Sequence, residues 1–133
     1  MNPHVDRLMA ETEAAMRGVR DGYRGPVHAG VDLGTAYTVL IVLDDGFRPL
    51  AGAYRFADVV RDGLVVDFIG AIDLLRGLKR EVEARLGFEL THAATGYPPG
   101  VGAAPTRKKR WCRETHRMVF MPRRKPGPMN TPV

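Results

Sequence analysis

Residues 27–45 read VHAGVDLGTAYTVLIVLDD, and this pattern predicts two strands joined by a turn around Gly34 and Thr35. Asp32 interrupts the first apolar run just before that turn. A carboxylate at such a position is costly to bury without a partner. We therefore expect Asp32 to belong to a functional site rather than to the packing of the sheet.

The turn also carries groups that suit an anion. A glycine at position 34 would let the backbone take a positive φ and approach a ligand closely. Thr35 and Thr38 supply hydroxyls, and successive N–H groups of a turn form a concave nest. The Asp32 carboxylate suits a hydrated Mg²⁺ ion. These parts predict a nucleotide-phosphate site on a hairpin, and spacing alone equally allows an ordinary hairpin with Gly34 as its turn glycine.

The pattern on either side of this hairpin predicts the other elements. Residues 48–57 alternate as a third strand, and residues 90–96 form a fourth. Between them, residues 68–86 have helical periodicity, with Asp67 as N-cap and Gly87 as the closing residue. This β-β-β-α-β order predicts an α/β fold with a mixed sheet, in which a three-strand antiparallel meander is followed by a parallel fourth strand.

The two ends of the chain differ from this central region. The pattern of residues 1–26 predicts a flanking N-terminal helix, capped by Asn2, and a linker. We expect this helix to pack on the domain; the alternative is that it binds a partner. Residues 27–104 form the predicted domain. Residues 105–133 are rich in proline and arginine and predict a disordered basic tail.

Three segments in order resemble a known family. GVDLGTAYTVLIVLD resembles the first phosphate motif of the actin, hexokinase and heat-shock-chaperone ATPase superfamily. RDGLVVDFIGAIDLL resembles the segment that follows in bacterial actin-like and chaperone-like members. The run AGAYRFADVVRDGLVVDFIGAIDLLRGLK, followed by LTHAATGYPPG, is similar to the EutJ family, the chaperone-like proteins of ethanolamine-utilisation gene clusters.

This resemblance implies the N-terminal subdomain of an actin-like ATPase fold, which is ribonuclease H-like, with ATP and Mg²⁺ as cofactors. By carry-over, Asp32 would be the catalytic residue and would position Mg²⁺ through water. Backbone groups of Gly34, Thr35, Ala36 and Tyr37 would wrap the β- and γ-phosphates. Hydrolysis in such a site rests on electrostatic positioning rather than covalent chemistry.

The sequence departs from the family in two respects. Ala36 stands where chaperone relatives carry a second threonine, and the second phosphate loop and adenosine motif do not occur after residue 101. We therefore expect a truncated form that binds nucleotide weakly and has no turnover of its own, which leaves open whether it is an enzyme. The alternatives are a non-enzymatic partner-binding module and a bacterial actin-like or pilus-assembly relative.

The composition indicates the compartment in which we expect the protein. Hydrophobic residues make up 44% of the 133 residues, without an apolar run long enough to span a bilayer. The one cysteine excludes an internal disulfide and suits a reducing compartment, so we expect a cytoplasmic protein without membrane contact. The resemblance adds association with a bacterial microcompartment, with ethanolamine-utilisation enzymes or shell proteins as partners.

The tail concentrates the positive charge. Residues 107–133 hold nine Lys or Arg and one Asp or Glu, whereas the net charge of the whole chain is +5. Salt-sensitive nucleic-acid binding is one interpretation, which we disfavour. A frameshifted terminus explains the abrupt change of composition better. Cys112 and His116 have a ligand-like spacing but lack the second pair that a zinc site needs.

Overall fold

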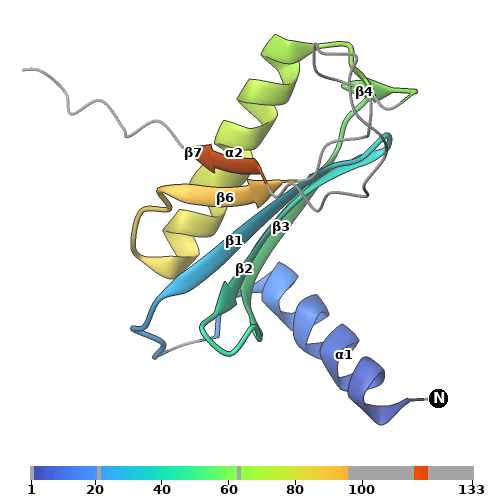
Figure 1. The fold of residues 1–133 in the computed structure, drawn as a ribbon. Coiled ribbons are helices and arrows are strands. Elements are labelled where there is room, and N and C mark those ends of the chain that lie inside the picture. The colour runs from blue at the N-terminus through green and yellow to red at the C-terminus, as the bar shows by residue number, and fades with distance from the viewer. Residues whose placement is uncertain (1, 21, 63, 96–115, 120–133) are drawn as a thin grey trace, which may run out of the picture.

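The computed structural model describes residues 2–20, 22–62, 64–95 and 116–119 (Figure 1). Its helices are α1 (Pro3–Arg17) and α2 (Phe68–Leu86). Its strands are β1 (Val27–Leu33), β2 (Tyr37–Asp44), β3 (Pro49–Phe56), β4 (Val60–Arg61), β5 (Leu64–Val65), β6 (His92–Thr95) and β7 (His116–Val119). The elements predicted from the sequence are therefore present, with bounds that differ by one or two residues.

The strands form a five-stranded sheet in the order β3-β2-β1-β6-β7 and a separate pair, β4-β5. β1, β2 and β3 make an antiparallel meander, and β6 runs parallel to β1 after the crossover through α2. This confirms the predicted topology. β7 pairs antiparallel with β6, so these four residues of the expected disordered tail have regular structure, whereas the rest of the predicted tail lies outside the described residues.

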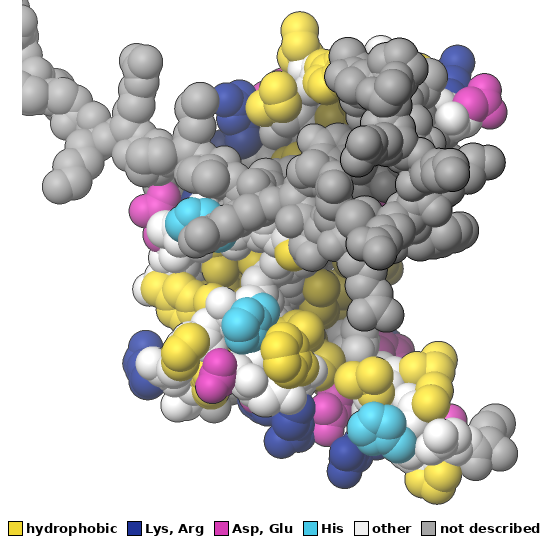
Figure 2. All heavy atoms as spheres, viewed as in Figure 1, with side chains coloured by type: hydrophobic (Ala, Val, Ile, Leu, Met, Phe, Trp, Pro, Cys, Tyr) yellow, Lys and Arg dark blue, Asp and Glu magenta, His cyan; other side chains and the backbone are white. Residues whose placement is uncertain are grey.

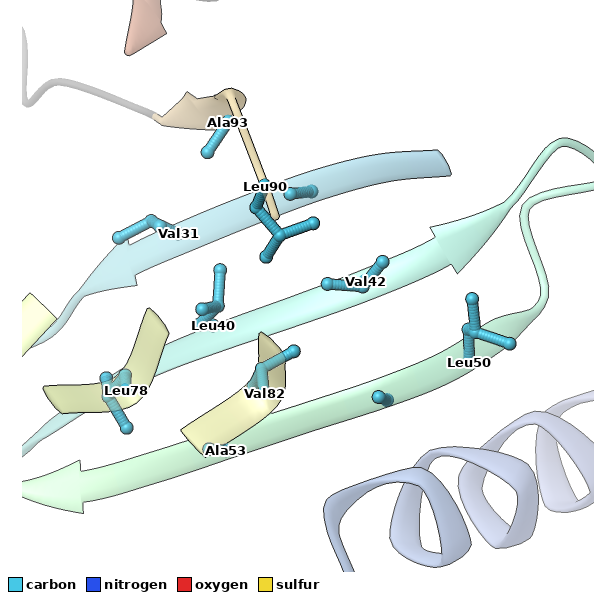
Figure 3. Packing of buried hydrophobic residues seen from close by; sticks show 11 residues of the cluster. Val31, Leu40, Val42, Leu50, Ala53, Leu78, Val82, Leu90 and Ala93 are labelled. Carbon is cyan, nitrogen blue, oxygen red and sulfur yellow. The ribbon is translucent and has the colours of Figure 1, made fainter. Parts of the chain in front are cut away.

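One face of the sheet packs against α2 and forms the core (Figure 3). Leu40 and Val42 from β2 meet Leu78 and Val82 from α2, and all four side chains are fully buried. The strict alternation of buried residues along β2 follows from the two-residue repeat of a strand. Burial of each such side chain stabilises the fold by about 1.5–3 kcal/mol.

Both ends of α2 are defined by the residues that the sequence predicts. The Asp67 carboxylate accepts a hydrogen bond from the Gly70 N–H at 2.8 Å, and Gly87 takes the left-handed conformation at φ 80°. The helical periodicity of residues 68–86 predicts an apolar stripe that includes Ile69 and Ile72, and this prediction is wrong over the first turns, because these side chains are 75% and 46% exposed. Ala71 makes the contact there, since it faces the cluster beneath β4 and β5.

A buried ion pair fixes the connection from α2 to β6. The Glu83 carboxylate lies 2.6 Å from Lys79 Nζ and also accepts a hydrogen bond from the Leu90 N–H at 2.7 Å. Leu90 itself is buried in the core beside β1 (Figure 3). These contacts position the start of β6 next to β1.

The opposite face, here called the outer face, is covered in part by α1. The packing depends on Gly52, because a Cβ there would lie 2.8 Å from Met16 Sδ and 3.0 Å from Ile41 Cδ1. Ala15 is buried in this contact. The N-terminal half of α1 extends beyond the sheet (Figure 1), and its apolar side chains are exposed, namely Val5, Leu8 and Met9.

The outer edge of β3 has its carbonyl groups occupied. The Arg20 N–H donates to Leu50 O at 3.0 Å, beside an isolated bridge between Val19 and Ala51. Arg85 Nη1 donates to Gly52 O at 2.7 Å, and Arg55 Nη1 donates to Tyr54 O at 3.1 Å. Such partners protect an edge strand from pairing with another chain.

Candidate functional site

Asp32 lies near the end of β1 and its side chain is exposed. Its neighbour Val31 is buried against the core, so alternation along the strand places Asp32 on the outer face. Its register partner on β2 is Val39. No described residue forms a hydrogen bond or an ion pair with the carboxylate. The structure therefore leaves this carboxylate exposed to solvent, and the ligand role of Asp32 stays a prediction.

The turn after Asp32 is held by its own backbone. The Gly34 N–H donates to Tyr37 O at 2.9 Å, and the Ala57 N–H donates to Ala36 O at 3.0 Å. The expected positive φ at Gly34 is wrong, because the described glycines with positive φ are Gly22 and Gly87. The glycine is needed for a close approach instead, since a Cβ at position 34 would lie 2.6 Å from Tyr37 O.

The donors that remain in the turn belong to the next two residues. Thr35 and Ala36 are exposed, and their N–H groups have no acceptor among the described residues. Tyr37 is exposed as well, at 51%. The predicted group of Gly34, Thr35, Ala36 and Tyr37 is thus contiguous at the surface, but the Gly34 N–H already has an acceptor within the turn.

Thr38 cannot take part in this site. Its side chain is fully buried on the core face, opposite the face that carries Asp32, so its predicted hydroxyl contribution is wrong. The Thr38 Oγ1 atom has no hydrogen-bond partner in the part of the chain that the structure describes. A buried hydroxyl without a partner carries a desolvation cost. We therefore expect Thr38 to affect the free energy of unfolding rather than ligand binding.

The opposite end of the same hairpin shows how a structural aspartate is used here. Asp44 Oδ1 accepts hydrogen bonds from the Gly46 and Arg48 N–H groups, each at 2.9 Å, and the carboxylate pairs with Arg20. The pKa of Asp44 lies below its usual value, chiefly because of the Arg48 N–H and then the Arg20 guanidinium. The sequence pattern alone does not indicate this network.

Two hollows occur elsewhere on the described surface. One of about 230 Å³ lies between α1 and β3, where Glu11 pairs with Arg48 at 2.9 Å. Another of about 530 Å³ is lined by residues 25–29 and 88–94, including His28 and His92. His92 Nδ1 lies 2.9 Å from Thr91 Oγ1, and both side chains are exposed. Neither hollow includes the turn after Asp32.

The described residues also limit the metal and membrane interpretations. Among them, three or more His, Cys, Asp or Glu side chains do not gather into a metal-binding group. Cys112, whose ligand-like spacing to His116 is insufficient for a zinc site, lies outside these residues. In the same part of the chain, neither helix has the length and apolar character required to span a bilayer.

Comparisons with known proteins identify similar chains over part of this one. The ethanolamine utilization protein EutJ of Salmonella typhimurium is 49% identical over 75 residues, which are 56% of this chain and 27% of that protein. EutJ of Escherichia coli K12 is 45% identical over 75 residues, with the same coverage. This chain therefore spans about a quarter of the length of these curated relatives. No family model matches the sequence.

A solved structure gives the same result for the fold. The crystal structure of EutJ from Carboxydothermus hydrogenoformans matches with a TM-score of 0.69 and 45% identity, covering 73% of this chain and 37% of that chain. The predicted similarity to EutJ is confirmed, and the mixed α/β arrangement matches the actin-like fold of EutJ. The partial coverage fits an N-terminal subdomain.

Proposed function

We propose that this EutJ-like chain provides a phosphate-binding hairpin that receives the triphosphate of a magnesium nucleotide, ATP in the first place. Its role would be that of a chaperone-like component of ethanolamine utilisation in the cytoplasm. One observation carries the proposal: Asp32 presents an exposed carboxylate without a described partner, directly before a turn with two free N–H groups.

The contrast with Asp44 supports this assignment. Asp44 sits in the turn at the other end of β2 and has two backbone donors and an arginine, as a structural carboxylate does. Asp32 has no comparable partners among the described residues. An exposed carboxylate without a structural role is available to a ligand.

The residues around the turn supply part of what a bound magnesium nucleotide requires. Asp32 would hold Mg²⁺ through water, since this ion keeps several waters and binds through one or two carboxylates and the phosphates of a substrate. The Thr35 and Ala36 N–H groups would donate to phosphate oxygens, with the Thr35 hydroxyl beside them. When bound, the metal would neutralise charge on the phosphates. Gly34 would act by its lack of a side chain rather than by its N–H group.

We expect weak binding and no turnover from this chain alone. Two free N–H groups and one carboxylate supply few contacts, and Ala36 offers no hydroxyl. The matched segment covers 27% of the EutJ relatives, so contacts that the remaining length would supply are outside the match. Enzymes of ethanolamine utilisation or shell proteins of a microcompartment are the partners that we propose for the chaperone-like role.

A second candidate function is a partner-binding module that does not use nucleotide. The observation that favours it is the N-terminal half of α1, where Val5, Leu8 and Met9 are 46%, 43% and 65% exposed. Figure 2 shows hydrophobic side chains along this helix. Such a module would bind its partner equally well with and without Mg²⁺ and ATP.

Calorimetric titration of the full chain with tripolyphosphate, with and without Mg²⁺, tests the phosphate site. We expect Mg²⁺-dependent binding that Asp32→Asn weakens at least ten-fold. Asp45→Asn is the matched control, because Asp45 is an exposed aspartate at the opposite end of the same hairpin. Equal loss in both variants, or no binding to the wild-type chain, would refute the phosphate site. Mg²⁺-dependent turnover would refute the expected lack of hydrolysis.

A further inference from the structure

Three aromatic side chains stand exposed on the outer face, where the cover provided by α1 ends. Tyr37, Tyr54 and Phe56 are 51%, 53% and 71% exposed. Their rings contact one another edge to face: the ring centroids of Tyr37 and Tyr54 are 5.9 Å apart, and those of Tyr37 and Phe56 are 5.7 Å apart. This group is called the aromatic platform below. Large aromatic side chains usually bury much of their area, so three exposed neighbours require an explanation.

The strand register places the platform beside Asp32. Asp32 pairs with Val39 on β2, and Val39 pairs with Tyr54 on β3, so these three residues form one row across the sheet. Tyr37 and Phe56 form the next row, towards the turn. The row on the other side, at Ile41 and Gly52, is where Met16 of α1 packs. The helix thus leaves uncovered the two rows that adjoin the candidate phosphate site.

We propose that the aromatic platform stacks the base of the nucleotide whose phosphates the turn receives, which makes this part of the sheet a mononucleotide site. The inference rests on the proposed function of the turn. With strands about 4.8 Å apart, Asp32 and Tyr54 lie roughly 10 Å from each other across the row. This separation suits a nucleotide that has its metal-bound phosphates at one end and its base at the other.

The chemistry of the surface favours a base over the two other occupants that an exposed aromatic group suggests. A second copy of the chain pairing along the edge of β3 would have to displace the Arg20, Arg85 and Arg55 donors from their carbonyl acceptors. A protein partner would not need the exposed carboxylate of Asp32 in the same row as Tyr54. A base needs an exposed aromatic ring on which to stack. It does not need hydrogen-bonding side chains around it, since stacking does not depend on hydrogen bonds to the base.

The test compares ATP with tripolyphosphate, both with Mg²⁺, on the full chain. Stacking of one base on an aromatic side chain is worth about 1–3 kcal/mol, so ATP should bind at least about five-fold more tightly than tripolyphosphate. Tyr54→Thr, which keeps a good strand former, should remove this preference while leaving the affinity for tripolyphosphate unchanged. Phe56→Thr should reduce it to a smaller extent.

The matched control is Phe47→Asn. Phe47 is also an exposed aromatic residue, stacked on His28 at the other end of the sheet, and its φ of 59° suits asparagine. This variant should keep the full preference for ATP. Equal affinity for ATP and tripolyphosphate in the wild-type chain would overturn the base site and leave the phosphate site standing. Absence of binding to both ligands would overturn both proposals.

Sedimentation velocity of the same proteins distinguishes the remaining occupant. We expect a monomer whose sedimentation coefficient is the same in the wild-type chain and in Tyr54→Thr. A dimer that Tyr54→Thr dissociates would assign the platform to self-association and overturn the base site. Circular dichroism confirms that each variant retains the wild-type fold.

Discussion

The two faces of the sheet use the same three strands in different ways. Towards α2, side chains of β2 such as Leu40 and Val42 are fully buried against Leu78 and Val82. On the outer face, α1 covers the rows around Gly52, while Tyr54 and Phe56 remain exposed at the end of β3. The outer-facing residues of β3 are therefore covered by α1 at Gly52 and exposed at Tyr54 and Phe56.

This difference separates stability from function. The α2 face holds the fold together and has one buried polar atom without a partner, Thr38 Oγ1, among the described residues. The outer face carries the exposed carboxylate, the aromatic platform and the turn, in which two N–H groups have no acceptor among the described residues. We therefore expect substitutions on the α2 face to change the free energy of unfolding, and those on the uncovered outer rows to change ligand binding.

The largest effect is expected on the α2 face. Leu78→Ala should lower the free energy of unfolding by about 2–5 kcal/mol, because it leaves a cavity between α2 and β2. Chemical denaturation followed by circular dichroism measures this loss. The same truncation of an exposed leucine, Leu8→Ala, is the control and should cost less than about 0.5 kcal/mol. Equal losses would contradict the division between the two faces.

The next effect concerns the contact between α1 and the outer face. Gly52→Ala places a methyl group 2.8 Å from Met16 Sδ, so it should destabilise the chain by about 1–3 kcal/mol and loosen α1. Gly77→Ala on α2 is the matched control, since its Cβ would meet nothing within 4 Å. That change should stabilise the chain by about 0.5–1 kcal/mol, because alanine favours a helix. Thermal denaturation of both variants gives the comparison. A stabilising Gly52→Ala would show that α1 does not pack as described.

A smaller effect of opposite sign is expected at Thr38. Thr38→Val replaces the unpartnered hydroxyl by a methyl group of similar shape, so the free energy of unfolding should stay the same or rise by about 1 kcal/mol. Nucleotide affinity should not change, because Thr38 faces α2 and not the turn. A loss of stability on denaturant unfolding would show that the hydroxyl has a partner in solution.

The smallest effect is the acid dependence of the hairpin. Because the pKa of Asp44 is lowered in the folded chain, its contribution is complete above the unfolded value of about 3.9 and is lost as the pH falls through the folded value. Asp44→Asn should therefore flatten the fall in stability below about pH 4. Melting temperatures measured between pH 2.5 and 6 test this. If the loss of stability with falling pH were unchanged in Asp44→Asn, this loss would be assigned to Glu11 or Asp58, whose pKa values are also lowered.

Local patterns predicted much of this structure. Strand alternation in residues 27–57 gave the meander, and the capping residues Asp67 and Gly87 gave both ends of α2. The expectations that failed depend on which face a residue occupies. Ile69 has the spacing of a core residue, but its side chain is exposed in the first turn of α2. This exposure depends on how α2 packs against the sheet, which the spacing does not contain.

The candidate site shows the same limit. Sequence spacing identified Asp32 and the turn, but it could not place Thr38 on the opposite face or assign the Gly34 N–H to Tyr37 O. The aromatic platform was also missed, although Tyr54 and Phe56 alternate visibly on β3. Their exposure depends on where α1 ends above the sheet, which the strand pattern does not contain.

The most direct test is to follow the backbone amide signals of the full chain by nuclear magnetic resonance during titration with Mg²⁺ and ATP. We predict that the largest shifts fall on residues 32–37, with Thr35 and Ala36 foremost, and that Asp32→Asn abolishes them. Smaller shifts should appear at Tyr54 and Phe56. Shifts confined to the hollow at residues 25–29 and 88–94, or no shifts at the turn, would contradict a phosphate site at the end of β1.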